Sequence, residues 1–227
     1  MWQSETNPRN IPGMATVPDT RSRIVATAEH LFRVYGYQKT TVADIAKELK
    51  MSPANVYRFF QSKKELTEAV ARLLMGGVEA AAAAIAAQED EPAASRLRRL
   101  IAEVSRMNAE RYVADNKMHE MCAVAMTEAW PLVEAHIEYM RSLLERIIAD
   151  GIASGEFRAG DAKVFAQCVH KSIIVLCHPL MIAECGSEQT SALLGPMSDF
   201  VVAALRAHKD AEPGPRTKSA HPRKSLV

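Results

Sequence analysis

The sequence lacks the features that place a protein in a membrane or outside the cell. Its 227 residues contain no uninterrupted apolar run of about 18 residues, the length that spans a bilayer. The first residues have neither the basic start nor the apolar core of a secretory signal. Cysteines are few and form no Cys-x-x-Cys pair; they are Cys122, Cys168, Cys177 and Cys185. We therefore expect buried, reduced thiols in a cytoplasmic protein with no membrane partner.

The motifs of common enzymes are also missing. The chain has no glycine-rich phosphate loop, no Gly-x-Ser-x-Gly motif and no alternation of strand and helix patterns. His119 and Glu120 begin like the His-Glu-x-x-His motif of zinc proteases, but the second histidine is missing. No Glu-x-x-His pair is present to build a di-iron site. We therefore expect a protein that is not an enzyme and that holds neither a cofactor nor a metal.

What the chain does contain is enough apolar material for a core and an uneven distribution of charge. Hydrophobic residues make up 48% of the sequence, and the net charge is only +1. Residues 19–64 nevertheless contain nine Lys or Arg and only four Asp or Glu. Residues 65–209, in contrast, contain fourteen Lys or Arg and twenty Asp or Glu. A small basic segment joined to a larger acidic one indicates that only the first segment binds a polyanion.

The basic segment contains the pattern of two short helices separated by a tight turn. Thr41 is a suitable N-cap, and apolar residues recur from Val42 to Leu49 at the spacing of one helical face. Ser52 is a second N-cap, and Pro53 occupies the first helical position, where its missing N–H costs nothing. Only two residues separate the first helix from this cap, so the stretch predicts a helix-turn-helix.

The second of these helices is predicted over residues 53–59 and is expected to enter the major groove of DNA. Val56 and Phe60 should face inward, which leaves the opposite side free to read bases. On that side an asparagine can pair with adenine and an alanine can contact a thymine methyl. Tyr57 and the two lysines that open the next helix are placed to hold phosphates. The predicted DNA contacts are Thr41, Ser52, Pro53, Ala54, Asn55, Tyr57, Arg58, Lys63 and Lys64.

Residues 21–66 resemble the DNA-binding domain of the tetracycline-repressor (TetR) family of transcriptional regulators. Two positions depart from the family pattern. Lys50 stands in the turn where the family usually has glycine, and a left-handed backbone there would cost lysine roughly 1 kcal/mol. Phe59 stands where the family often has histidine. The residues that match the family at its spacing are Gly36, Thr41, Ile45, Ala46, Met51, Ser52, Val56, Tyr57, Phe60, Lys63 and Leu66.

The remainder of the chain shows helical patterns only, so we predict an all-α protein. Its expected parts are a disordered arm (1–18), a three-helix helix-turn-helix domain (19–64), a larger helical domain (65–209) and a disordered tail (210–227). Pro179 is expected to end or kink one helix, and the pair at 195–196 to interrupt another. The helices of the larger domain are predicted at about 63–88, 93–114, 116–128, 130–154, 161–177 and 187–208.

The resemblance implies that the larger domain binds a small-molecule effector and dimerises. It implies a homodimer on a palindromic operator, most simply a repressor that the effector releases. The last two long helical stretches, about 161–184 and 187–208, are the expected dimer interface because they are rich in apolar residues, notably Ile173, Ile174, Leu176, Leu193, Phe200, Val201 and Leu205.

Soft apolar side chains suit the wall of a site for an irregular or hydrophobic ligand. The polar anchors of such a site are sought among His119, His136, His170 and His178. The residues predicted to bind the ligand are Met107, Met121, Cys122, Met126, Trp130, Tyr139, Phe165 and His170.

Two other functions remain open at this point. The histidines and cysteines of the larger domain would suit a regulator that senses a metal or an oxidant. A helical binding protein without a regulatory role, in which the helix-turn-helix is a remnant, is the less favoured alternative.

Overall fold

The computed structural model describes residues 19–112 and 116–206, and every regular element within these ranges is an α-helix. The all-α prediction is therefore confirmed. The predicted disordered arm (1–18) and disordered tail (210–227) lie outside the described residues. In chain order the helices are α1 (Thr20–Tyr35), α2 (Val42–Glu48), α3 (Pro53–Tyr57), α4 (Lys63–Ala86), α5 (Ala93–Tyr112), α6 (Asn116–Glu128), α7 (Trp130–Ala153), α8 (Ala162–Cys177), α9 (Pro179–Cys185) and α10 (Ser187–Leu205).

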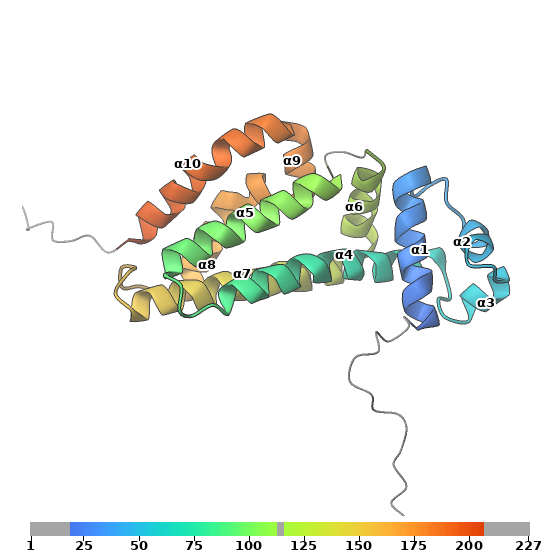
Figure 1. Cartoon of the computed structure of the whole chain (residues 1–227), viewed down its shortest axis with the longest axis horizontal. Helices are drawn as coiled ribbons and strands as arrows, with labels where there is room; N and C mark the ends of the chain where they lie inside the picture. Colours follow the sequence, from blue (N-terminus) through green and yellow to red (C-terminus); the bar gives the residue numbers. More distant parts are fainter. Residues whose placement is uncertain (1–18, 113–115, 207–227) are drawn as a thin grey trace, which may run out of the picture.

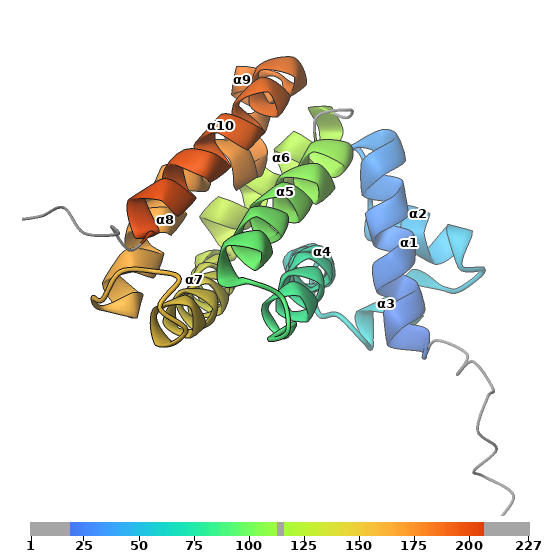
Figure 2. The ribbon, with the colours of Figure 1, turned by 60° about the vertical axis from the view of Figure 1, so that its left-hand side comes forward.

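The helices enclose a smaller and a larger apolar core, and α4 takes part in both (Figure 1). Its N-terminal half, from Leu66 to Leu74, packs with α1, α2 and α3. Its C-terminal half, from Val78 to Ala86, packs with α5, α7, α8 and α10. Seen from a second direction, α1–α3 stand at one end of the molecule while α8 and α10 form the opposite side (Figure 2). One continuous helix therefore joins the two units.

Helix α4 also has the length and apolar composition of a membrane span, and the bent pair of α8 and α9 passes the same test. In the structure, however, α4 lies against α1, α5, α6 and α7. Its apolar side fills the two cores, which explains the composition without a membrane.

Helices α2 and α3 begin at the caps that the sequence predicted. Thr41 and Asp44 form a reciprocal capping box at the start of α2. The hydroxyl of Ser52 accepts a hydrogen bond from the backbone N–H of Asn55, at 3.2 Å, and so caps α3. The side chain of Val56 is fully buried, as predicted. Helix α3 ends two residues earlier than predicted, because the chain turns after Tyr57 to bury Phe60 in the same core.

The turn between α2 and α3 contains the strained residue that the resemblance pointed to. Lys50 has a φ of 55°, the left-handed conformation that favours glycine. The turn is held by hydrogen bonds from the N–H of Lys50 to the carbonyl of Lys47 and from the N–H of Met51 to the carbonyl of Ala46. The surrounding packing therefore imposes this backbone on lysine at an energetic cost.

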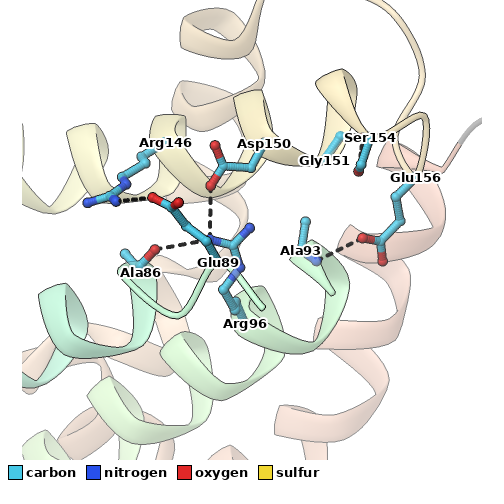
Figure 3. A network of polar contacts seen from close by, with 9 residues as sticks. All are labelled: Ala86, Glu89, Ala93, Arg96, Arg146, Asp150, Gly151, Ser154 and Glu156. Atoms are coloured by element: carbon cyan, nitrogen blue, oxygen red, sulfur yellow. Dashed lines mark hydrogen bonds and ion pairs between the residues drawn. The ribbon is translucent and has the colours of Figure 1, made fainter. Parts of the chain in front are cut away.

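A buried polar network fastens the far end of the larger unit (Figure 3). The guanidinium of Arg96, on α5, donates to the carbonyl of Ala86 at 3.0 Å and to the carboxylate of Asp150 at 2.9 Å. Glu156, in the loop after α7, accepts hydrogen bonds from the backbone N–H groups of Ala93 and Ala94 and so caps α5 from a distance. The ends of α4, α5 and α7 are thereby fixed to one another.

Of the two helix breaks predicted at prolines, the one at Pro179 is confirmed and the one at Pro196 is wrong. The bend at Pro179 separates α8 from a distinct helix, α9, and the two helices are inclined by 53°. Pro196, in contrast, lies inside α10 and does not interrupt it. A proline there frees the carbonyl four residues earlier, that of Ala192, and both residues are exposed, so water can hydrate it. Helices α4, α7 and α10 each end between one and three residues earlier than predicted, and the predicted end of the helix at 93–114 lies outside the described residues.

Replacing Lys50 by glycine is expected to raise the free energy of unfolding by about 1 kcal/mol, because glycine adopts the left-handed conformation without steric cost. Urea denaturation would measure the change. The matched control is Lys47→Gly, in the last turn of α2, which should lower the free energy of unfolding by about 1 kcal/mol. Destabilisation by Lys50→Gly would contradict the assignment of strain to this residue.

Candidate nucleic-acid interface and internal cavity

The outward side of α3 presents a compact set of polar and small side chains. Ser52–Ala54 are exposed, Arg58 is exposed directly after the helix, and Tyr57 is 48% exposed. Asn55 is half-buried, with its backbone N–H held by Ser52. All the residues predicted to contact DNA on and beside α3 are therefore at least partly exposed, while Val56 is buried. Their side chains offer the kinds of polar group that read base edges in a major groove.

Thr41 caps the start of α2, and its side chain already has a partner. Its hydroxyl donates to the carboxylate of Asp44 at 2.6 Å and accepts from the backbone N–H of Asp44 at 3.2 Å. The bonds that Thr41 donates from its hydroxyl and its backbone N–H hold the pKa of Asp44 below its usual value. Thr41 thus has a structural role in addition to the DNA contact predicted for it.

The two predicted phosphate-binding lysines differ sharply in the structure. Lys64 is exposed, whereas Lys63 turns inward and donates to the backbone carbonyl of Tyr37 at 2.6 Å. Its ammonium also lies 4.1 Å from the centre of the Tyr37 ring. Burial lowers the pKa of Lys63, and the nearby carboxylate of Glu120 opposes that shift. The ammonium of Lys63 is therefore already engaged inside the protein, where it stabilises the loop after α1.

The larger unit contains a cavity of about 150 Å³ bounded by helices α4 to α9. Its wall is mostly aliphatic, with methionines from α4, α6 and α7: Met75, Met121, Met126 and Met140. An apolar cavity of about this volume can hold a ring the size of benzene. The site is therefore suited to the apolar part of a small molecule.

The structure places four of the eight predicted ligand-binding residues in the wall of this cavity, namely Met121, Cys122, Met126 and His170. The other four lie elsewhere. Met107 packs against the larger core, and Trp130 and Tyr139 are 46% and 43% exposed. The guanidinium of Arg158 lies over the ring of Phe165, with its central carbon 4.5 Å from the ring centre. These four side chains do not line this cavity, and the ligand contacts predicted for them stay predictions.

Sequence reasoning missed two polar residues of the wall, Asn108 and Arg111. Both continue the inward stripe of α5, since they follow Leu100 and Val104 at helical spacing. That periodicity is the signal in the sequence that marks these two polar side chains as inward-facing. The amide nitrogen of Asn108 donates to the carbonyl of Cys177 at 2.6 Å and so ties α5 to the end of α8.

Three histidines also line the cavity. Burial lowers the pKa of His170 and of His178, so both imidazoles are uncharged at neutral pH. The Nδ1 atom of His170 is buried without a hydrogen-bond partner. His136 pairs through Nδ1 with the carboxylate of Glu79 at 2.7 Å. The cavity therefore has polar groups at a few fixed places in an otherwise apolar wall.

The cysteines and histidines bear on the alternative that the regulator senses a metal or an oxidant. No group of three or more potential metal ligands occurs among the residues that the structure describes. Burial raises the pKa of Cys122 to about 11 and that of Cys177 to about 12, so both remain unreactive thiols at neutral pH. Cys168 and Cys185 are exposed, in contrast to the burial expected from the sequence.

Helix α6 connects the cavity to the helix-turn-helix unit. Met121 lines the cavity and is 1% exposed, yet it packs in the smaller core with α1 and α4. Cys122 lines the cavity as well and lies against the same core. The ammonium of Lys117, one turn earlier, donates to the backbone carbonyl of Val34 at the end of α1. A change of shape in the cavity therefore acts directly on a side chain of the smaller core.

The depressed pKa values predict how stability depends on pH. The folded state favours neutral His170 and His178, whereas the unfolded chain binds protons near pH 6.5, so the free energy of unfolding should fall as pH drops below about 6.5. The charges that face His170 are those of Arg141 and Lys171, with His136 and His178 nearby. Urea unfolding at a series of pH values would measure the slope. The double variant H170Q and H178N should flatten the dependence of the free energy of unfolding on pH between pH 5 and 6.5. An unchanged slope would contradict the assignment of this dependence to the two histidines.

Comparison with known proteins identifies both structural units. Residues 24–70 match the family model described as bacterial regulatory proteins, tetR family. Residues 93–195 match the model described as tetracyclin repressor-like, C-terminal domain. No curated protein matches this chain.

Solved structures with a similar fold cover nearly the whole described chain. A transcriptional regulator of the TetR/AcrR family from Thermobifida fusca is 20% identical, covers 84% of this chain and 100% of its own, and has a TM-score of 0.60. SmeT, the repressor of the Stenotrophomonas maltophilia multidrug efflux pump SmeDEF, is 19% identical and has a TM-score of 0.62. The match covers 91% of this chain and 98% of SmeT. SmeT also matches as its triclosan complex, at 18% identity, 90% and 99% coverage and a TM-score of 0.61.

Because the two family models fall on the two structural units in the expected order, the chain belongs to the TetR family and is a DNA-binding transcriptional regulator.

Proposed function

We propose that this regulator is a repressor, that it binds a palindromic operator as a homodimer, and that a small molecule in the α4–α9 cavity releases it. The observation that carries the proposal is the outward face of α3, anchored from behind by the buried side chains of Val56 and Phe60. SmeT, which shares the fold, is named as a repressor and has a triclosan complex. A regulator of this kind acts in the cytoplasm, where the DNA is.

The proposed reading of DNA divides the exposed residues into two groups. Asn55 and Arg58 are assigned to base edges, because asparagine pairs with adenine and arginine with guanine. Ser52, Pro53 and Ala54 form the part of the helix that enters the groove first. Tyr57, Lys64 and Thr41 are assigned to phosphates, which fix the position of the helix without reading sequence. Lys63 is left out because its ammonium is held by Tyr37.

The proposed dimer interface lies on α8 and α10, which pack side by side. Large apolar side chains are exposed there: Val164 is 49%, Leu193 43% and Phe200 67% exposed. Leu193 and Phe200 are seven residues apart and so share one face of α10. Four helices, two from each protomer, would bury them as a bundle. Of the residues expected at this interface from the sequence, Ile173, Leu176, Val201 and Leu205 instead belong to the monomer's own core.

The proposed release of DNA passes through α6. A ligand that fills the cavity displaces Met121, which packs in the core beneath the helix-turn-helix. Two recognition helices of a dimer must lie about 34–36 Å apart to enter successive major grooves, so a small shift of the unit lowers affinity for DNA. Linkage requires the converse, that DNA lowers affinity for the ligand by the same factor.

The DNA-reading assignment is tested on duplexes selected from a random pool for binding to the wild type. Asn55→Ala should cost about 1–3 kcal/mol on the selected sequence and leave the salt dependence unchanged, because Asn55 carries no charge. Lys64→Ala should weaken binding to all sequences and reduce the slope of log K against log salt by about 1 per contact. Gel shifts at several salt concentrations measure both effects.

Gln88→Ala, just beyond the far end of α4, is the matched control for the loss of an amide and should bind DNA like the wild type. Recovery of no preferred sequence, or wild-type affinity for the Asn55 variant, would contradict the reading surface.

The dimer is tested by Phe200→Glu, which places a charge in the proposed apolar interface. Light scattering at micromolar concentration should report a dimer for the wild type and a monomer for the variant, since burying an unpaired carboxylate is strongly unfavourable. Leu73→Glu is the matched control, because Leu73 is 51% exposed on α4, outside this interface. A wild type that is monomeric, or a Phe200→Glu variant that stays dimeric, would refute the interface.

A further inference from the structure

We propose that the α4–α9 cavity takes a small monocarboxylate, with its apolar part among the methionines of the wall and its carboxylate against the guanidinium of Arg111. The inference deepens the proposed function by naming the chemical class of the effector, and it rests on that function for the consequence that binding releases DNA. It starts from the arginines of α5, which differ in whether they form an ion pair with a carboxylate.

Four arginines of α5 have a carboxylate partner in the structure. Arg96 pairs with Asp150 and Arg98 with Asp199, each at 2.9 Å. The remaining two pairings are those of Arg99 with Glu91 and of Arg106 with Glu103 and Glu110.

Arg111, near the end of the same helix, is the exception, since none of the ion pairs in residues 19–112 and 116–206 includes it. One guanidinium nitrogen of Arg111, Nη1, donates to the backbone carbonyl of Leu74 at 3.0 Å. The other nitrogen, Nη2, lies beside Gly77 of α4, 4.0 Å from the position that a Cβ atom would occupy on that glycine. Leu74 lines the cavity together with Arg111, so the guanidinium is fixed on α4 at the wall of the cavity. Neutral backbone cannot balance its charge, which leaves a cation ready to bind an anion bidentately.

The rest of the wall makes the cavity more favourable still for an anion. It contains no aspartate and no glutamate among the described residues, and its other ionisable groups are three imidazoles and two thiols. The carboxylate of Glu79, which contacts the wall residue His136, is already engaged by that imidazole. A wall whose only fixed charge is positive favours an anion and repels a cation. A neutral ligand would leave the guanidinium without an anion to balance its charge.

The apolar part of the ligand is limited by the cavity itself. Its volume of about 150 Å³ corresponds to one six-membered ring or a short alkyl chain. The flexible side chains of Met75, Met126 and Met140 can adjust to either shape. The combination of one cation and an apolar chamber of this size matches an aromatic or short aliphatic monocarboxylate.

The test compares three probes of one shape, 4-methylbenzoate, 4-methylbenzyl alcohol and 4-methylbenzylamine, by calorimetry on the full-length protein without DNA. The wild type should bind the carboxylate about ten- to hundredfold more tightly than the alcohol, the range expected for a charge-assisted hydrogen bond. The amine should bind more weakly than the alcohol. Arg111→Gln keeps a donor for the carbonyl of Leu74 but removes the charge, so it should abolish the preference for the carboxylate while the alcohol binds as before.

Arg106→Gln is the matched control, since it neutralises an exposed arginine of the same helix that does not line the cavity; it should retain the preference. Arg111→Lys keeps the positive charge and should retain part of the preference for the carboxylate. Equal affinity of the wild type for carboxylate and alcohol, no binding of any probe at millimolar concentration, or an unchanged preference in Arg111→Gln would overturn the inference. Tight binding of the carboxylate without any change in DNA affinity would instead overturn the proposed function and leave this inference standing.

Discussion

The burial of one methionine side chain connects the two halves of this protein. Met121 lies in the core formed by α1 and α4 and, at the same time, in the wall of the cavity. Protein cores are close-packed, so a side chain shared by a core and a cavity cannot move in one without disturbing the other. The second connection is α4, whose two halves belong to separate cores. In the proposed mechanism these two connections carry an event in the larger unit to α3.

This arrangement explains why the larger unit is fastened so firmly at its other end. Arg96, Asp150 and Glu156 fix the ends of α4, α5 and α7 to each other, far from the helix-turn-helix (Figure 3). The cavity lies between that network and α6. In the proposed mechanism a ligand in the cavity acts on the DNA-binding unit through α6, which lines the cavity and packs against α1. The polar groups of the wall, including the guanidinium of Arg111, are proposed to select the ligand.

The sequence was sufficient for the helix-turn-helix and insufficient for the cavity, for physical reasons. Caps such as Thr41 and Ser52 and the inward spacing of Val56 are local signals, and the structure confirms them. The inward turn of Lys63 depends on the ring and carbonyl of Tyr37, a contact across 26 residues that no local pattern encodes. Membership of the cavity wall depends on how six helices pack. Composition therefore found Met121 and Met126 but also Trp130 and Tyr139, which face solvent.

The central claim, that one side chain reports both on the cavity and on DNA, can be tested directly with methyl NMR on protein labelled at methionine. Xenon fills apolar cavities of this kind and serves as a neutral probe. The account predicts that the Met121 methyl signal shifts when xenon is added and shifts again when a selected DNA duplex is added. The Met197 signal, from α10 outside the cavity, should move in neither titration. A Met121 signal that responds to xenon but not to DNA would contradict the account.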